Sequence, residues 1–230
     1  MTASPASRAM PHAKYAKSAE TQRAILDAAI LAFGKDGFEA TSTRAIAAFA
    51  GVNQPAINYH FGSKDALYLA CAHAIVEDFA RGTGKSSLAA AQYLANTRDR
   101  AASVSHLKAV MRELVELLAG SREASVRSAF VLREMHSPGE AYTILYESIW
   151  APGIKLVADL LDAARGNAQP SGEAKLQAIM LISSLVAFTS GRQVSKAVMQ
   201  WDEIGDAERA QVHKLTEQQI DALVASGQQG

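Results

Sequence analysis

Apolar side chains recur at helical spacing along most of the chain, and no stretch alternates apolar and polar residues for more than a few positions. Near the N-terminus, Ile25, Ala28, Ala29 and Phe33 repeat at intervals of three and four residues, which predicts a helix that starts at about Ser18. The sequence therefore predicts an all-α fold. Further helices are expected over residues 43–50, 54–59, 64–81, 103–120, 125–135, 139–150, 154–165, 173–199 and 206–224.

Capping residues and helix breakers separate these helices. Ser42, Asn53 and Ser63 each stand directly before an expected helix, where their side-chain oxygens can accept from free backbone N–H groups. Gly51 ends one short helix, and Pro55 is tolerated in the first turn of the next. Stretches that favour a linker or a boundary are Gly34 with Gly37, residues 82–87, Pro138, Pro152 and residues 166–172.

The two short helices over 43–50 and 54–59 are joined by an Ala-Gly-Val turn. Ile46, Ile57 and Phe61, with Ala50 and Val52, are spaced to close a small core around that turn. This arrangement predicts a helix-turn-helix whose second helix enters the major groove of DNA.

Amides at Gln54 and Asn58 can pair with base edges, and Ser42, Thr43 and Arg44 lie at a helix N-terminus that favours phosphate. Each of these residues alone could equally be an ordinary surface or capping residue, so their common spacing is what supports the prediction. The predicted DNA-binding residues are Ser42, Thr43, Arg44, Asn53, Gln54, Pro55, Ala56, Asn58, Tyr59, His60 and Lys64.

Composition and charge set limits on this interpretation. The 230 residues are 49% hydrophobic, and 23 basic side chains balance 23 acidic ones, so a DNA-binding surface must be local. Cys71 is the only cysteine, which excludes an intramolecular disulfide. The longest uncharged apolar stretch, Leu176–Gly191, falls short of the roughly 20 residues of a membrane span. A cytoplasmic protein without a membrane segment, a signal peptide or a cofactor is expected.

The N-terminal region resembles the DNA-binding domain of the TetR/AcrR family of transcriptional regulators. One departure is Asn58, where the family usually has a tyrosine; here Tyr59 lies one position later, so a tyrosine–phosphate contact does not transfer directly. The residues that carry the resemblance are Gly37-Phe38, Thr41-Ser42, Arg44, Ile46-Ala47, Ala50-Gly51-Val52, His60-Phe61, Ser63-Lys64 and Leu67.

Three further stretches resemble the CerR-like (CecR-like) subgroup of that family. They are Asn58–Lys64, then Phe130–Met135 followed by Ser137-Pro138 and Ala141, and finally Trp201–Gly205. Residues 1–18 are rich in Ala, Ser and Pro and carry three basic side chains, which predicts a flexible basic arm, with a solvated tail without a role as the alternative. The resemblance implies a helix-turn-helix domain over 19–66 and a helical ligand-binding and dimerisation bundle over 67–230. It implies a homodimeric repressor that a small-molecule effector releases from a palindromic operator in double-stranded DNA.

The resemblance also implies that the last two long helices form the dimer interface. The helix over 173–199 is apolar on more than one side and the last helix carries an apolar stripe, which agrees, although both faces could instead be covered within one subunit. The predicted interface residues are Ile179, Ile182, Val186, Leu215, Ile220 and Leu223. The remaining helices are expected to enclose the effector, although plain core packing is an alternative for each candidate. The pocket candidates are Phe130, Arg133, Met135, Tyr142, Tyr146 and Trp150.

Two other classes of function are weighed against this prediction. An enzyme has little support, because the six histidines are scattered and no serine stands in a nucleophile elbow. Cys71 and His73 diverge on a helix, so no metal site is expected, and Gly82–Ser87 lacks the glycine and the strand of a phosphate-binding loop. A DNA-binding protein without an effector remains the third possibility, which ligand-induced stabilisation can test.

Overall fold

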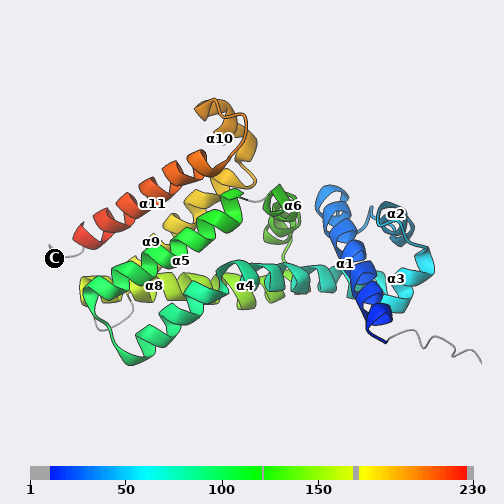
Figure 1. The fold of residues 1–230 in the computed structure, drawn as a ribbon, viewed down its shortest axis with the longest axis horizontal. Coiled ribbons are helices and arrows are strands. Elements are labelled where there is room, and N and C mark those ends of the chain that lie inside the picture. The colour runs from blue at the N-terminus through cyan, green and yellow to red at the C-terminus, as the bar shows by residue number, and fades with distance from the viewer. Residues whose placement is uncertain (1–10, 121, 168–170, 227–230) are drawn as a thin grey trace, which may run out of the picture. The chain divides into compact units, whose positions relative to one another are not determined.

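The chain folds into two compact helical units. The computed structural model describes the backbone of residues 11–120, 122–167 and 171–226. The first unit is Met1–Cys71 and the second is Ala72–Gly230, so their boundary lies inside α4 (Lys64–Asn96) rather than at its start. The first unit also contains α1 (Pro11–Asp36), α2 (Thr43–Phe49) and α3 (Gln54–Phe61), shown in blue and cyan in Figure 1.

The core of the first unit forms where α1, α2, α3 and the start of α4 bring apolar side chains together. Ile46 of α2 and Ile57 of α3 are fully buried, as predicted for the core around the turn. Rings add to this core: Phe33 meets Tyr68 edge-on with centroids 4.9 Å apart, and Phe38 meets the same tyrosine at 5.1 Å. Helix α1 begins at Pro11, so residues 11–17 are helical, whereas a flexible arm was predicted there; residues 1–10 of that predicted arm lie outside the described residues.

Cys71 closes this core from α4 and is fully buried. Burial raises the pKa of its thiol, and the nearby Asp27 carboxylate raises it further. The reactive thiolate is therefore scarce at neutral pH, and a thiol reagent reaches Cys71 only when the unit opens by local unfolding. We expect Ellman's reagent to modify the folded protein at least about a hundredfold more slowly than the denatured protein. Equal rates in the two states would contradict a closed core at this position.

The second unit is a bundle in which α5, α8, α9 and α11 pack around a shared apolar core (Figure 1). Leu107 and Met111 of α5, Leu160 and Leu161 of α8, and Ile220 of α11 are among its most deeply buried side chains. The elements of this unit after α4 are α5 (Arg100–Gly120), α6 (Arg122–His136), α7 (Glu140–Leu145), η1 (Tyr146–Trp150), α8 (Ala151–Arg165), α9 (Gly172–Ser184), η2 (Leu185–Phe188), α10 (Arg192–Met199) and α11 (Asp206–Ser226).

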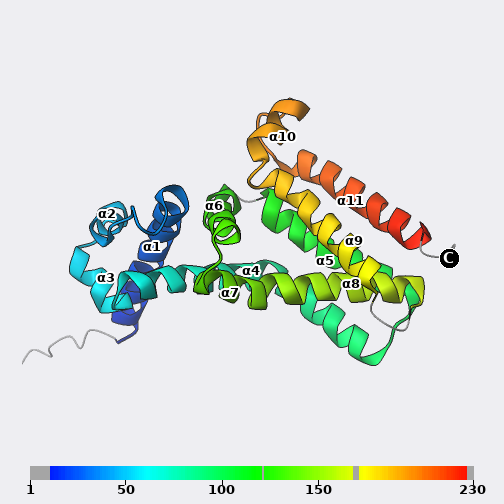
Figure 2. The same ribbon diagram turned by 180° about the vertical axis from the view of Figure 1, so that it is seen from behind.

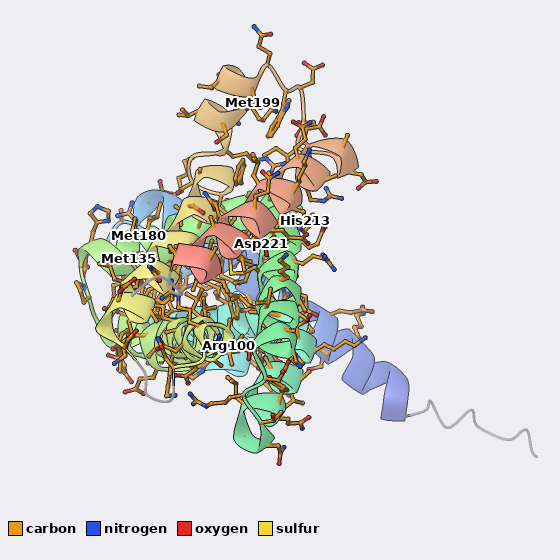
Figure 3. All side chains as sticks on the ribbon, turned by 90° about the vertical axis from the view of Figure 1, so that its left-hand side faces the viewer. Arg100, Met135, Met180, Met199, His213 and Asp221 are labelled. Carbon is orange, nitrogen blue, oxygen red and sulfur yellow. The ribbon has the colours of Figure 1, made fainter. Side chains whose placement is uncertain are left out.

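Ion pairs fasten the outer sides of α5 and α11 to each other. Arg112 meets Glu217 at 2.6 Å, and Lys108 meets Asp221 at 2.7 Å. Figure 3 labels His213 and Asp221 on α11, and His213 Nε2 lies 2.6 Å from a Glu116 carboxylate oxygen. These pairs are partly exposed and stabilise little one by one, but they fix how the two helices face each other.

Residues 82–87 are helical, so the predicted linker there is wrong. They continue α4 without a break to Asn96. Packing accounts for one of the two glycines: a Cβ at Gly82 would come within 2.9 Å of the Leu117 side chain, so glycine lets α5 approach, whereas a Cβ at Gly84 would meet nothing within 4 Å. Thr83 is buried and its hydroxyl bonds the Phe79 carbonyl oxygen at 3.0 Å, inside the helix. Tertiary contact thus outweighs the weak helix propensity of the segment.

The single helix predicted over 173–199 is also wrong, because the chain bends by 74° between the segment Gly172–Phe188 and α10 (Figure 2). The 3₁₀ turn η2 and Thr189-Ser190-Gly191 form the bend. A Cβ on Gly191 would meet the Ala187 backbone oxygen at 2.9 Å, and the Ser195 hydroxyl donates to that same oxygen. Ser and Thr hydroxyls compete with the backbone for carbonyl oxygens and so favour such a break.

Pro152 does not separate two helices as predicted. It lies in the first turn of α8, and the π-helical turn η1 joins α7 directly to α8. The Ala151 N–H bonds the Tyr146 carbonyl oxygen, five residues back, in a wider π-type turn. This turn accommodates Pro152, which has no N–H to donate.

Within the described ranges, no single helix has the length and apolar composition to cross a membrane, and only the bent pair Gly172–Phe188 with Arg192–Met199 meets that test together.

Candidate functional site

Two capped helix starts and one glycine turn build the helix-turn-helix. Ser42 Oγ accepts from the Ala45 N–H at 3.1 Å, and Asn53 Oδ1 accepts from the Ala56 N–H at 3.0 Å, so both predicted caps are confirmed. Between the helices Gly51 has a φ of 69°, a backbone conformation that residues other than glycine rarely adopt. The turn is closed where the Val52 N–H bonds the Ala47 carbonyl oxygen at 3.0 Å.

Helix α3 buries one face and exposes the other. Ile57 is fully buried against α2, whereas Gln54, Asn58 and Tyr59 are exposed, with Tyr59 exposing 83% of its surface. Pro55 is also exposed at the N-terminal end of α3, in front of a turn whose N–H groups point outward. The arrangement leaves two amides and a phenol on one solvent-facing surface, which suits recognition of base edges and phosphates.

The side chains of α2 and of the α4 start divide into free and engaged groups. Arg44 is exposed in the first turn of α2, where the helix dipole favours an anion. Gln54 Nε2 donates to Thr43 Oγ1 at 3.3 Å, so the two helices already share a side-chain contact at the predicted surface. Lys64 is half-buried and its ammonium stacks over the Phe38 ring at 4.3 Å. Lys64 must therefore leave or share this cation–π contact to reach a phosphate.

Sequence reasoning missed two residues that shape this surface. Thr41 is buried and donates to the Gly37 carbonyl oxygen at 2.6 Å, which holds the loop between α1 and α2. Phe49 exposes 67% of its surface on α2 although it lies three residues after the buried Ile46. The threonine could have been suspected as a buried polar residue of the loop; the phenylalanine had the spacing of a core residue and gave no signal.

The predicted pocket residues do not line a hollow that lies between other elements of the second unit. Phe130 is fully buried, Met135 and Tyr146 are largely exposed, and Tyr142 stacks parallel to Tyr146 with centroids 6.0 Å apart. The hollow, of about 630 Å³, lies instead between α4, η1 and α8. None of Phe130, Arg133, Met135, Tyr142, Tyr146 and Trp150 belongs to its lining.

The predicted interface residues split into exposed and buried groups. Ile179, Val186 and Leu215 expose 44%, 42% and 61% of their surfaces. Ile182 and Leu223 are half-buried and pack against the core of the unit. Ile220 is fully buried inside that core between α11 and its neighbours, so an intermolecular role for it is excluded.

Among the residues that the structure describes, no three His, Cys, Asp or Glu side chains form a group that could hold a metal ion.

Two family models match the chain, one near its N-terminus and one over its C-terminal part. Residues 25–71 match the family of bacterial regulatory proteins named after TetR, and residues 104–226, more than half of the chain, match the C-terminal domain of the HTH-type transcriptional dual regulator CecR. The CecR of Shigella flexneri is 29% identical over 209 residues, which cover 90% of this chain and 93% of that protein.

Solved structures share the fold. A TetR-like regulator from Rhodococcus sp. RHA1 has a TM-score of 0.59 and 22% identity, over 89% of this chain and 96% of that one. The SmeT–triclosan complex has a TM-score of 0.58 and 22% identity, over 90% of both chains. The chain belongs to the TetR family of DNA-binding transcriptional regulators, which is a family of regulators and not of enzymes, and, through its C-terminal domain, to the CecR group within that family.

Proposed function

We propose that this regulator is a homodimeric repressor that a small-molecule effector releases from a palindromic operator. The observation that carries the proposal is the exposed face of α3, where Gln54, Asn58 and Tyr59 project beside the anion-favouring start of α2. Gln54 and Asn58 would read base edges, since an amide can pair with adenine through two hydrogen bonds. Ser42, Thr43, Arg44, Asn53, Tyr59, His60 and Lys64 would hold the phosphates, with Pro55 and Ala56 packing close to the backbone.

A second copy of the chain is the proposed partner of α9. Leu176, Ile179 and Met180 lie at intervals of three and four residues and are exposed, so they share one unpartnered apolar face (Figure 3 labels Met180). Leu215 offers a further exposed apolar side chain on α11. An isologous pairing of these faces would cover them and set two recognition helices about one DNA turn apart.

Effector release would act through α4. Residues Lys64–Cys71 of α4 belong to the DNA-binding unit, and Phe79 to Ala95 of the same helix line the hollow. A ligand that binds one arrangement of α4 more tightly than another can change DNA affinity by up to the ratio of its affinities for those two arrangements. SmeT, a structural neighbour, is described in complex with triclosan, which supports a ligand site in this fold.

The direction of control needs its own measurement, because the Shigella relative is named a dual regulator. Selection of bound DNA from a random pool should return an inverted repeat, and a reporter placed behind that sequence should be silenced by the regulator. Higher reporter output in the presence of the regulator would contradict repression, while leaving DNA binding intact.

Two substitutions should separate base reading from phosphate binding. Asn58→Ala is expected to reduce discrimination between the selected site and a mismatched site by about tenfold, because one amide pair is lost. Arg44→Ala should weaken binding to all sequences alike and lower the slope of log affinity against log salt by about one. Fluorescence anisotropy over a salt series measures both effects. If Asn58→Ala reduced affinity equally for every sequence, the residue would belong with the phosphate contacts.

A further inference from the structure

We propose that the hollow between α4, η1 and α8 binds an apolar molecule that carries one ammonium group, and that Asp159 receives this group. The inference rests on the proposed release by a small-molecule effector and specifies its chemistry. The hollow of about 630 Å³ falls in the size range of ligand pockets in proteins. It lies wholly within the second unit.

Most of the lining is apolar. Phe79, Leu88 and Leu94 contribute from α4, Ile149 from η1 and Leu156 from α8. Leu88 exposes 60% of its surface, so the hollow leaves a large apolar side chain without cover. The body of the ligand should therefore be hydrocarbon, since burial of such surface supplies most of the binding free energy in pockets of this kind.

Asp159 is the acidic residue of the lining and lies on α8, with only 8% of its surface exposed. Its Oδ2 accepts from Lys155 Nζ at 2.5 Å, one helical turn earlier. Its Oδ1 is buried and accepts no hydrogen bond from any described residue. A buried acceptor without a donor is costly, so a ligand that donates to Oδ1 recovers this free energy on binding.

The charges around the hollow decide what kind of donor fits. Arg98 and Lys155 are its two basic residues; the Lys155 side chain is 70% exposed and can move outward without desolvation. A carboxylate has enough lone pairs to accept from Lys155 and from a second donor at once. An ammonium is the donor favoured at Oδ1, because charge-assisted hydrogen bonds are about twice as strong as neutral ones.

Three probes with one carbon skeleton test this assignment on the full-length protein: 4-phenylbenzylamine, 4-phenylbenzyl alcohol and 4-phenylbenzoate. Calorimetry should show the amine binding about tenfold more tightly than the alcohol, with the carboxylate weakest. The inference is overturned if the carboxylate binds best, which would assign the hollow to Arg98 and Lys155, or if the amine does not bind.

Variants identify the site of binding. Asp159→Asn should weaken binding of the amine about tenfold and leave the alcohol unchanged, whereas Lys155→Gln, which removes the competing cation, should strengthen binding of the amine. Asp202→Asn, an exposed carboxylate outside the hollow, is the matched control. Ala91→Phe fills the hollow and should weaken binding of amine and alcohol together. Unchanged amine affinity in Asp159→Asn would overturn the assignment of the ammonium to Asp159, and unchanged affinity for both amine and alcohol in Ala91→Phe would overturn the hollow as their binding site.

Operator binding measured in the same samples keeps this inference apart from the proposed function. Amine binding that depends on Asp159, without release of operator DNA, would leave the ligand site in place and refute effector release by this ligand class. Operator binding that is intact in a protein to which the amine does not bind would refute the site alone.

Discussion

Replacing Ile179 with aspartate is expected to leave the regulator monomeric at micromolar concentration and to weaken operator binding by about a hundredfold or more. Ile179 lies at the centre of the exposed apolar face of α9, between Leu176 and Met180. A carboxylate there would have to lose its hydration inside the proposed interface, which costs far more than the lost packing. Sedimentation velocity gives the oligomeric state, and anisotropy with the selected operator gives the affinity.

Val126→Asp is the matched control for this substitution. Like Ile179, Val126 is an exposed β-branched apolar residue, with 37% of its surface accessible. It lies on α6 rather than on α9 or α11. It should leave both the dimer and the operator affinity unchanged. A dimeric Ile179→Asp protein with full operator affinity would show that the α9 face does not join the two copies.

The DNA-binding unit could be predicted from the sequence because its signals are local. Ser42, Asn53 and Ser63 cap the helices that follow them, through hydrogen bonds to an N–H three residues later. Gly51 makes the turn with a positive φ, as its position between two short apolar helices indicates. Each of these features depends on neighbours within a few residues, so the pattern of residue types is sufficient to predict it.

The second unit was harder to predict because its decisive contacts join distant segments. The hollow is lined by residues 79–98 and 148–159, which no periodicity brings together, and the candidate aromatic residues pack elsewhere. At Gly82 the approach of Leu117 keeps a glycine-containing segment helical. The bend at Gly191 was predictable in principle, since Thr189-Ser190-Gly191 is a breaker sequence within an otherwise apolar run.

Buried polar residues hold the loop between α8 and α9 and were not foreseen either. Asp162 is fully buried; it accepts from the Ser171 N–H at 2.7 Å, from the Ser171 hydroxyl at 2.9 Å and from Asn167 Nδ2 at 3.1 Å. Ser171 in turn caps α9 by accepting from the Ala174 N–H at 3.0 Å. Nearby, Arg165 bonds the Leu223 carbonyl oxygen of α11 at 2.7 Å. This network positions the start of the helix that carries the proposed dimer face.

Asp162→Ala should therefore destabilise the second unit by about 3 kcal/mol, because the two half-buried donors of Ser171 and the exposed Asn167 amide lose their shared, fully buried acceptor in one step. For a chain of this size such a loss corresponds to a fall in Tm of roughly 10 °C. Thermal unfolding followed by circular dichroism measures it, with Asp202→Ala, which removes an exposed carboxylate, as the control that should shift Tm little. The dimer should weaken together with the fold, since the carboxylate, the Ser171 cap and the first turn of α9 are linked in series. A stable Asp162→Ala protein with an unaltered dimer would mean that the loop is held by its backbone alone, and that the buried carboxylate adds nothing to the position of α9.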